Sequence, residues 1–138
     1  MNILSLDIGN KKIGIAISES GIIASELTTI ANDEKAISFL IDLFNTKNIE
    51  KIIVGLPLLR SGDESLQAKM VKGFIVELLD KYQIPVVYED EILTTKEAER
   101  ILKQNGAPVS EIIRRTDQLS AKLILEQYLN NNLDNIKE

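Results

Sequence analysis

ILSLDIGNKKIGIAIS, residues 3–18, has the pattern of two strands joined by a tight polar turn. The first half is apolar almost throughout, and Gly9 with Asn10 then favours a turn. The second half alternates branched residues with small ones, beginning with Gly14. That alternation is typical of a strand whose one face is packed tightly against a neighbour.

Asp7 interrupts the apolar run, although aspartate is depleted in strand interiors. One interpretation is an aspartate that initiates the turn. The other is a carboxylate that binds a metal ion at the end of the strand, with Lys11 and Lys12 facing a phosphate. Residues 3–18 alone leave both interpretations open.

Composition restricts the chemistry that this chain can perform. Its 138 residues predict a single domain, 1–138, with a frayed tail at about 131–138. The chain has no cysteine and no histidine, which excludes disulfides, thiolate or histidine zinc sites, and Ser-His or Cys-His catalysis. Any reaction must therefore depend on carboxylates, lysines, hydroxyls or a bound metal ion.

The net charge of −5 argues against a protein that binds nucleic acid over its whole surface. It does not exclude a local basic face, and a group of acids that holds a divalent metal also lowers the isoelectric point. The sequence shows no leader, long apolar run or lipidation motif. We therefore expect a soluble cytoplasmic protein with no membrane partner.

Periodicity and helix-breaking residues predict the remaining elements, with Gly106 ending the third helix and Pro108 preventing an immediate restart. Strands are expected at 21–29, 51–55 and 85–89, and helices from 32 or 33 to 45, from 65 to 82, from 94 to 105, and from about 116 onward. The order βββαβαβαα predicts an α/β fold with a mixed five-stranded sheet and helices on both faces. This is the ribonuclease H-like arrangement, although other mixed α/β folds have the same order.

Carboxylates occur at three places where the predicted core begins or ends: Asp7, the run Glu89–Glu91, and Asp117. Each has a simple structural explanation, as a turn residue, a solvated loop or a helix cap. However, strands 3–8 and 85–89 should run parallel, so that Asp7 and the acidic run share one sheet edge. The residues alone leave open which acid of the run reaches that edge.

Carboxylates that meet at one edge repel each other unless a cation binds between them. Oxygen ligands suit Mg²⁺ or Mn²⁺, and two such ions can promote phosphodiester cleavage without histidine. Basic residues that can hold the phosphate backbone are Lys11, Lys12, Arg60, Arg114 and Arg115. The aromatic content of 4% makes base stacking a minor contribution, so recognition of backbone and shape is expected.

Four motifs in register carry a family resemblance: residues 7–16, 54–58, 90–98 and 117–125. In order and spacing they resemble the YqgF (RuvX) family over nearly the whole chain. The resemblance implies a ribonuclease H-like fold and a bacterial cytoplasmic nuclease. The family is described both as Holliday junction resolvases and as nucleases that process the 5′ end of pre-16S ribosomal RNA.

The resemblance also assigns site residues. Asp7, Glu91 and Asp117 match the family's acidic, metal-binding active-site residues. Two positions depart from the family pattern, since Lys12 and Ile92 stand where arginine is usual. Lys12 keeps its charge but cannot bind phosphate in the bidentate manner of arginine, and Ile92 has no charge.

The leading hypothesis is a metal-dependent nuclease, a hydrolase acting on ester bonds, that processes the 5′ end of pre-16S rRNA in a ribosome precursor. A monomer or weak dimer is expected. The first alternative is a resolvase of four-way DNA junctions, which should be a stable dimer. The others are a catalytically idle RNA-binding assembly factor, and an ATP-binding module of the actin or sugar-kinase type, for which one domain is too short to form the cleft.

Overall fold

The computed structural model describes residues 1–59, 61, 63–90 and 94–137. Its elements, in chain order, are β1 Ile3–Ile8, β2 Lys12–Ser18, β3 Ser25–Ala31, α1 Ala36–Thr46, β4 Lys51–Leu56, α2 Leu66–Lys81, β5 Val86–Asp90, α3 Thr94–Gln104 and α4 Val109–Lys137. The predicted order βββαβαβαα is therefore confirmed. None of the described helices has a segment long and apolar enough to cross a membrane.

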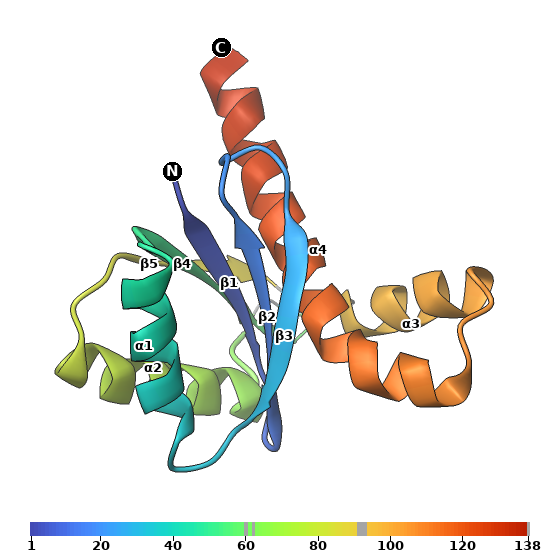
Figure 1. Cartoon of the computed structure of the whole chain (residues 1–138), viewed down its shortest axis with the longest axis horizontal. Helices are drawn as coiled ribbons and strands as arrows, with labels where there is room; N and C mark the ends of the chain where they lie inside the picture. The colour runs from blue at the N-terminus through green and yellow to red at the C-terminus, as the bar shows by residue number, and fades with distance from the viewer. Residues whose placement is uncertain (60, 62, 91–93, 138) are drawn as a thin grey trace.

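The strands form one mixed sheet in the order β3-β2-β1-β4-β5. β1, β2 and β3 pair antiparallel, whereas β4 pairs parallel with both β1 and β5. Helices α1 and α2 cover one face of the sheet, and α3 and α4 lie on the other (Figure 1). Because β1, β4 and β5 are parallel, their carboxyl ends share one edge, as the sequence predicts.

Alternation along β1 builds a core on each face. Leu4, Leu6 and Ile8 pack with the apolar sides of α1 and α2 in the larger cluster. Ile3 belongs to the second cluster, which contains Ile124 and other residues of α4. The odd-numbered side chains of β1 therefore face α4, and the even-numbered ones face α1 and α2.

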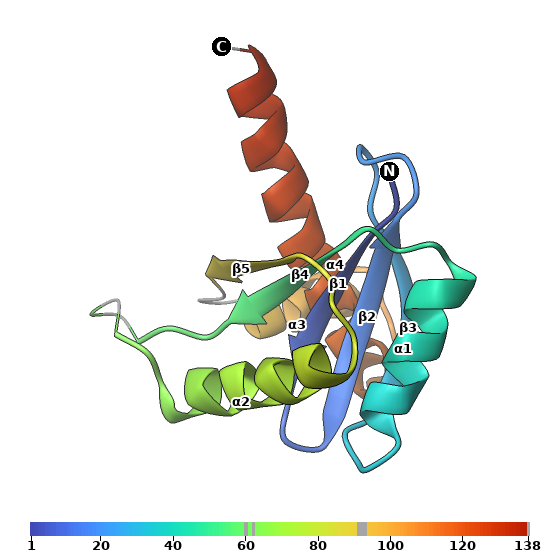
Figure 2. The same ribbon diagram turned by 90° about the vertical axis from the view of Figure 1, so that its left-hand side faces the viewer.

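Helix α4 begins at Val109, earlier than the predicted start near Thr116. Pro108 was expected to prevent a helix here, but proline is well tolerated at a helix start, where its missing N–H has no intrahelical partner. Glu111 in the first turn further favours this start. The helix also continues through Lys137, where a frayed tail was expected, and its last turns project beyond the sheet (Figures 1 and 2).

Helix α1 also begins later than predicted, with Lys35 rather than Asn32 or Asp33 at its N-cap position. Asp33 accepts a hydrogen bond from the Lys35 N–H at 2.9 Å and forms the turn that precedes the helix. The Asn32 side chain donates instead to the Gly9 carbonyl at 2.7 Å. Asn32 thus connects this loop to the turn between β1 and β2.

The sheet and α4 approach one another very closely at Gly14. A Cβ atom placed on Gly14 would lie 2.0 Å from the main-chain oxygen of Asp117 and 2.3 Å from its carbonyl carbon. Both atoms belong to backbone and cannot rotate away. Glycine is therefore the residue that allows α4 to lie directly on β2 at this point, as the predicted tight face of this strand requires.

Gly14→Ala is expected to destabilise the protein by about 1–3 kcal/mol, because α4 must shift away from β2. Gly73→Ala is the matched control, since a Cβ at Gly73 in helix α2 meets no atom within 4 Å. That substitution should stabilise the protein by about 0.5–1 kcal/mol. The measurement is urea unfolding of both variants, and a Gly14→Ala protein as stable as the wild type would contradict this packing.

Candidate active site

Asp7 faces helix α4 from the end of β1. Two residues earlier on the same face, the Ser5 hydroxyl donates a hydrogen bond of 2.6 Å to the Ala121 carbonyl of α4. Successive odd-numbered residues of a strand share one face, so the Asp7 side chain projects toward α4 as well. Asp7 is half-buried, near the carboxyl end of a strand that is otherwise buried.

Gly14 brings Asp7 and Asp117 together. Asp7 is the direct cross-strand partner of Gly14 in the β1–β2 pairing, and Gly14 contacts the main chain of Asp117. Directly paired residues of antiparallel strands have Cα atoms about 4.5–5.5 Å apart. Asp7 and Asp117, far apart in sequence, are therefore neighbours across a single glycine.

Asp117 lies well inside α4 rather than in its first turn, because the helix begins at Val109. The helix-cap explanation of this residue is therefore wrong, since favourable dipole effects are confined to the first turn. Burial raises the pKa of the Asp117 carboxyl above its ordinary value, and the Lys12 ammonium offsets part of that rise. The carboxylate is thus held in an environment that disfavours its charge, and a cation would relieve this cost.

The acidic run after β5 is described only in part. Glu91, assigned as the third acid by resemblance, and Ile92 lie outside the described residues. Glu89 is opposite Gly55 in the β4–β5 pairing and accepts a hydrogen bond of 2.7 Å from the Gln127 amide of α4. Within residues 1–59, 61, 63–90 and 94–137, no three acidic side chains are grouped to hold a metal ion.

The turn after Asp7 is held by side chains from two other segments. The Asn32 amide donates to the Gly9 carbonyl at 2.7 Å, and the Gln67 amide of α2 donates to the Ile8 carbonyl at 3.0 Å. The Gly9 N–H closes the turn on the Lys12 carbonyl at 2.8 Å. These bonds fix the backbone on which Lys11 and Lys12 are exposed. Sequence reasoning missed Asn32 and Gln67, because only the fold brings them to this turn.

The predicted basic residues fall into different environments. Lys11, Lys12 and Arg114 are exposed, and Arg60 lies outside the described residues. Arg115 forms ion pairs with Glu26 of β3 and Glu111 of α4, each at 2.9 Å. The hydrogen bonds with Glu26 and then Glu111 raise the pKa of the Arg115 guanidinium. In this conformation Arg115 joins α4 to the edge strand, a role that no local sequence pattern indicates.

Gln118 strengthens the same connection. Its amide donates to Glu26 at 3.1 Å, and its carbonyl oxygen accepts a bond of 3.4 Å from the Thr29 hydroxyl. Thr29 is in turn the β3 partner of Gly14. The helix turn that carries Asp117 is therefore attached to β3 on one side while it rests on β2.

Comparison with known proteins identifies relatives of this chain. A relative from Syntrophus aciditrophicus named "Putative pre-16S rRNA nuclease" is 41% identical over 94% of this chain and 88% of its own. One from Thermoanaerobacter pseudethanolicus with the same name is 40% identical over 94% and 96%. The predicted nuclease class is confirmed by these names.

Solved structures establish the fold independently. RuvC of T. thermophilus in complex with a Holliday junction substrate has a TM-score of 0.59 at 14% identity and covers 97% of this chain and 96% of its own. A fowlpox virus resolvase in complex with Holliday junction DNA also scores 0.59, at 15% identity over 96% and 99%. The predicted ribonuclease H-like fold is therefore confirmed. The profile of the RuvX family, described as Holliday junction resolvase, matches residues 1–131, and this chain belongs to that family.

Proposed function

We propose that this protein is a metal-dependent nuclease that hydrolyses phosphodiester bonds at the 5′ end of pre-16S rRNA in a ribosome precursor. Asp7, Glu91 and Asp117 are its proposed metal-binding catalytic residues. The observation that carries the proposal is the meeting of Asp7 and Asp117 across Gly14 in a member of the RuvX family. The names of the relatives support the choice of substrate.

The donor set fits a hard divalent cation. Asp7 and Asp117 lie on either side of Gly14, and burial raises the pKa of the Asp117 carboxyl because its charge is poorly solvated. Carboxylate oxygens suit Mg²⁺ or Mn²⁺, and we propose two ions, with Glu91 as the third acidic ligand. Bound there, such ions supply Lewis acidity that activates water and stabilises the leaving oxygen.

Protein groups around the acids have separate roles in this proposal. Lys11 and Lys12, exposed on the anchored turn, would bind backbone phosphates next to the acids, as would the exposed Arg114. Arg60 is proposed for the same role. Three of the five Arg115 N–H groups already bond to Glu26 and Glu111, so a phosphate would compete with the carboxylates that attach α4 for this side chain.

A four-way DNA junction is the alternative substrate. It is favoured by the description of the matching family and by the two junction-bound resolvases of the same fold. The same three acids would act on it. A resolvase must cut two strands symmetrically, so this alternative requires a stable dimer, which sedimentation would detect.

Asp7→Asn should reduce cleavage by more than about a hundredfold, because one ligand of the catalytic cation loses its charge. The experiment compares a labelled pre-16S 5′ leader RNA with a synthetic four-way DNA junction, each with Mg²⁺, with Mn²⁺ and with chelator. The matched control is Asp42→Asn, an exposed aspartate of α1 on the opposite face of the sheet, which should cleave normally.

Each result of that experiment has a defined meaning. Metal-dependent cutting of the RNA that Asp7→Asn abolishes supports the proposal, and cutting of the junction alone favours the alternative. Full activity in Asp7→Asn would show that the acids are assigned wrongly. No cutting of either substrate, and no metal binding, would leave an RNA-binding assembly factor.

Asp117→Asn should stabilise the metal-free protein at neutral pH. The folded-state pKa of Asp117 is raised, so its carboxylate destabilises the fold above that pKa and has no such effect below its ordinary pKa of about 3.9. The gain in unfolding free energy should therefore disappear as pH falls through the acid range. Urea unfolding with chelator measures this gain in unfolding free energy.

Added Mg²⁺ should then stabilise the wild type more than the Asp117→Asn variant, and equal stabilisation would contradict metal binding by Asp117.

Lys12→Ala and Arg114→Ala should each weaken RNA binding and reduce the slope of log affinity against log salt by about one. The exposed positions of both side chains make fold effects small. The control is Lys47→Ala, an exposed lysine at the end of α1, which should leave the slope unchanged. Binding is measured by fluorescence anisotropy with chelator, and an unchanged slope in both site variants would remove these residues from the interface.

A further inference from the structure

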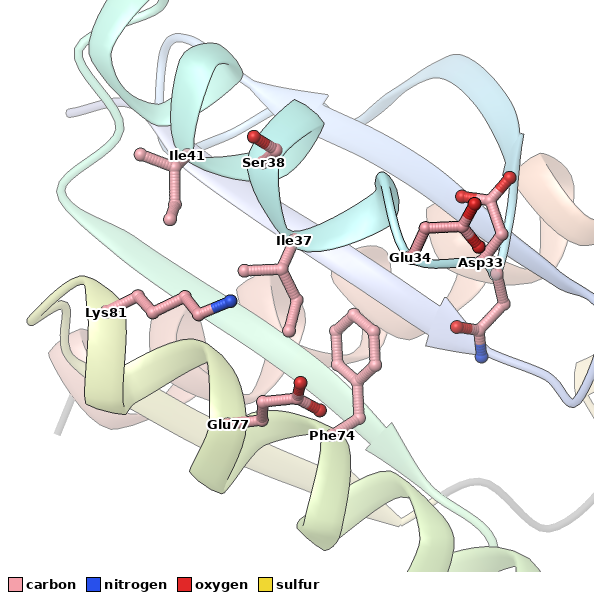
Figure 3. Close-up of a pocket in the computed structure, with 9 residues that line it drawn as sticks. Asp33, Glu34, Ile37, Ser38, Ile41, Phe74, Glu77 and Lys81 are labelled. Carbon is pink, nitrogen blue, oxygen red and sulfur yellow. The ribbon is translucent and has the colours of Figure 1, made fainter.

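A pocket of about 320 Å³ lies on the face of the sheet opposite Asp117, between helices α1 and α2. Its floor is apolar and consists of Ile37 and Ile41 of α1 and Phe74 of α2. In Figure 3, Ile37 and Phe74 reach toward one another between the two helices. The pocket thus has an apolar floor that the nuclease chemistry described above does not use.

Acidic side chains border this floor. Asp33 and Glu34 lie at the start of α1, and Glu77 projects from α2 beside Phe74 (Figure 3). Lys81 is the cation that lines the pocket. Within the described part of the chain, none of these four side chains forms an ion pair. Three exposed carboxylates and one ammonium therefore border the apolar floor, and the carboxylates form no ion pair with the described residues.

We propose that this pocket, the α1–α2 groove, docks a basic protein segment that carries one aliphatic or aromatic side chain between lysines or arginines. The apolar side chain would enter the floor formed by Ile37, Ile41 and Phe74, and the flanking cations would pair with Asp33, Glu34 and Glu77. Charge complementarity selects this occupant, because the carboxylates repel nucleic acid and anionic lipid. The apolar floor distinguishes the groove from a purely ionic surface, which would bind a polycation of any kind.

The location of the groove allows a segment to dock there while the acids at the other face remain accessible. Helices α1 and α2 cover one face of the sheet, whereas α4 with Asp117 covers the other, so a docked segment does not obstruct the acids. Asn32 lines the groove and also donates to the Gly9 carbonyl. A docked segment therefore lies next to the residue that holds the turn after Asp7. This proposal is independent of the substrate that the acids cleave.

The test uses two fluorescent peptides and anisotropy. The first peptide has one leucine flanked by lysines and arginines, and the second has serine in place of that leucine. The charge-reversal variant is Glu34→Lys/Glu77→Lys. Its matched control, Asp42→Lys/Asp80→Lys, introduces the same charge change at exposed positions of the same two helices that do not line the groove.

Wild type should bind the leucine peptide at least about tenfold more tightly than the serine peptide. The charge-reversal variant should lose at least about tenfold in affinity for the leucine peptide, and the control less than about twofold. Ile41→Ser, which leaves the charge unchanged, should reduce the preference for leucine. Thermal unfolding verifies that every variant is folded.

Three results would overturn the proposal. Equal loss in the groove and control variants would mean that only net charge matters. Equal binding of the two peptides, or full displacement of the leucine peptide by spermine at matched charge, would mean that the groove attracts any polycation. No measurable binding of the leucine peptide to the folded wild type would mean that the groove does not dock such a segment.

Discussion

The direct contact between β2 and the backbone of α4 at Gly14 is the constraint on which the rest of the structure depends. A helix approaches a sheet this closely only where side chains are absent or small. Gly14 satisfies that condition at Asp117, and Ala16 and Ala121 continue the close packing in the cluster beneath α4. Because Asp7 pairs with Gly14, the same contact that seats the helix also sets the separation of the two aspartates.

Polar contacts fix the direction of α4 across the sheet. The Ser5 hydroxyl binds the Ala121 carbonyl at the centre, Arg115 pairs with Glu26 toward the edge strand, and the Lys51 ammonium donates to the Tyr128 hydroxyl at 3.0 Å on the other side. A helix held at three points cannot rotate about Gly14. Asp7 and Asp117 therefore belong to regular, mutually anchored elements, and such support would hold the proposed catalytic residues in place.

Local sequence pattern predicted the elements well, whereas long-range pairing was largely invisible to it. The small residues of β2 indicated a tight face, but nothing near Gly14 identifies Asp117 as the residue that packs there. Pro108 was interpreted as a barrier, although a proline at a helix start is favourable and α4 begins at Val109. The sequence indicated only a phosphate contact for Arg115, because its partner Glu26 lies on a strand that is far away in the sequence. Asp7 was singled out early, since a carboxylate at the end of an apolar run is a local anomaly, and its role as a metal ligand stays a prediction.

The distribution of charge explains how a chain with net charge −5 can act on nucleic acid. Exposed Lys11, Lys12 and Arg114 lie near the aspartates, whereas Asp33, Glu34 and Glu77 border the groove on the opposite face. The field that a substrate experiences is local, because ions screen charges beyond about 8–10 Å at physiological salt. On the proposed function, carboxylates of the groove that lie beyond this distance from the acids would cost little in affinity for nucleic acid. They would also disfavour nucleic acid at the α1–α2 face, which leaves the edge that carries Asp7 as the favoured place.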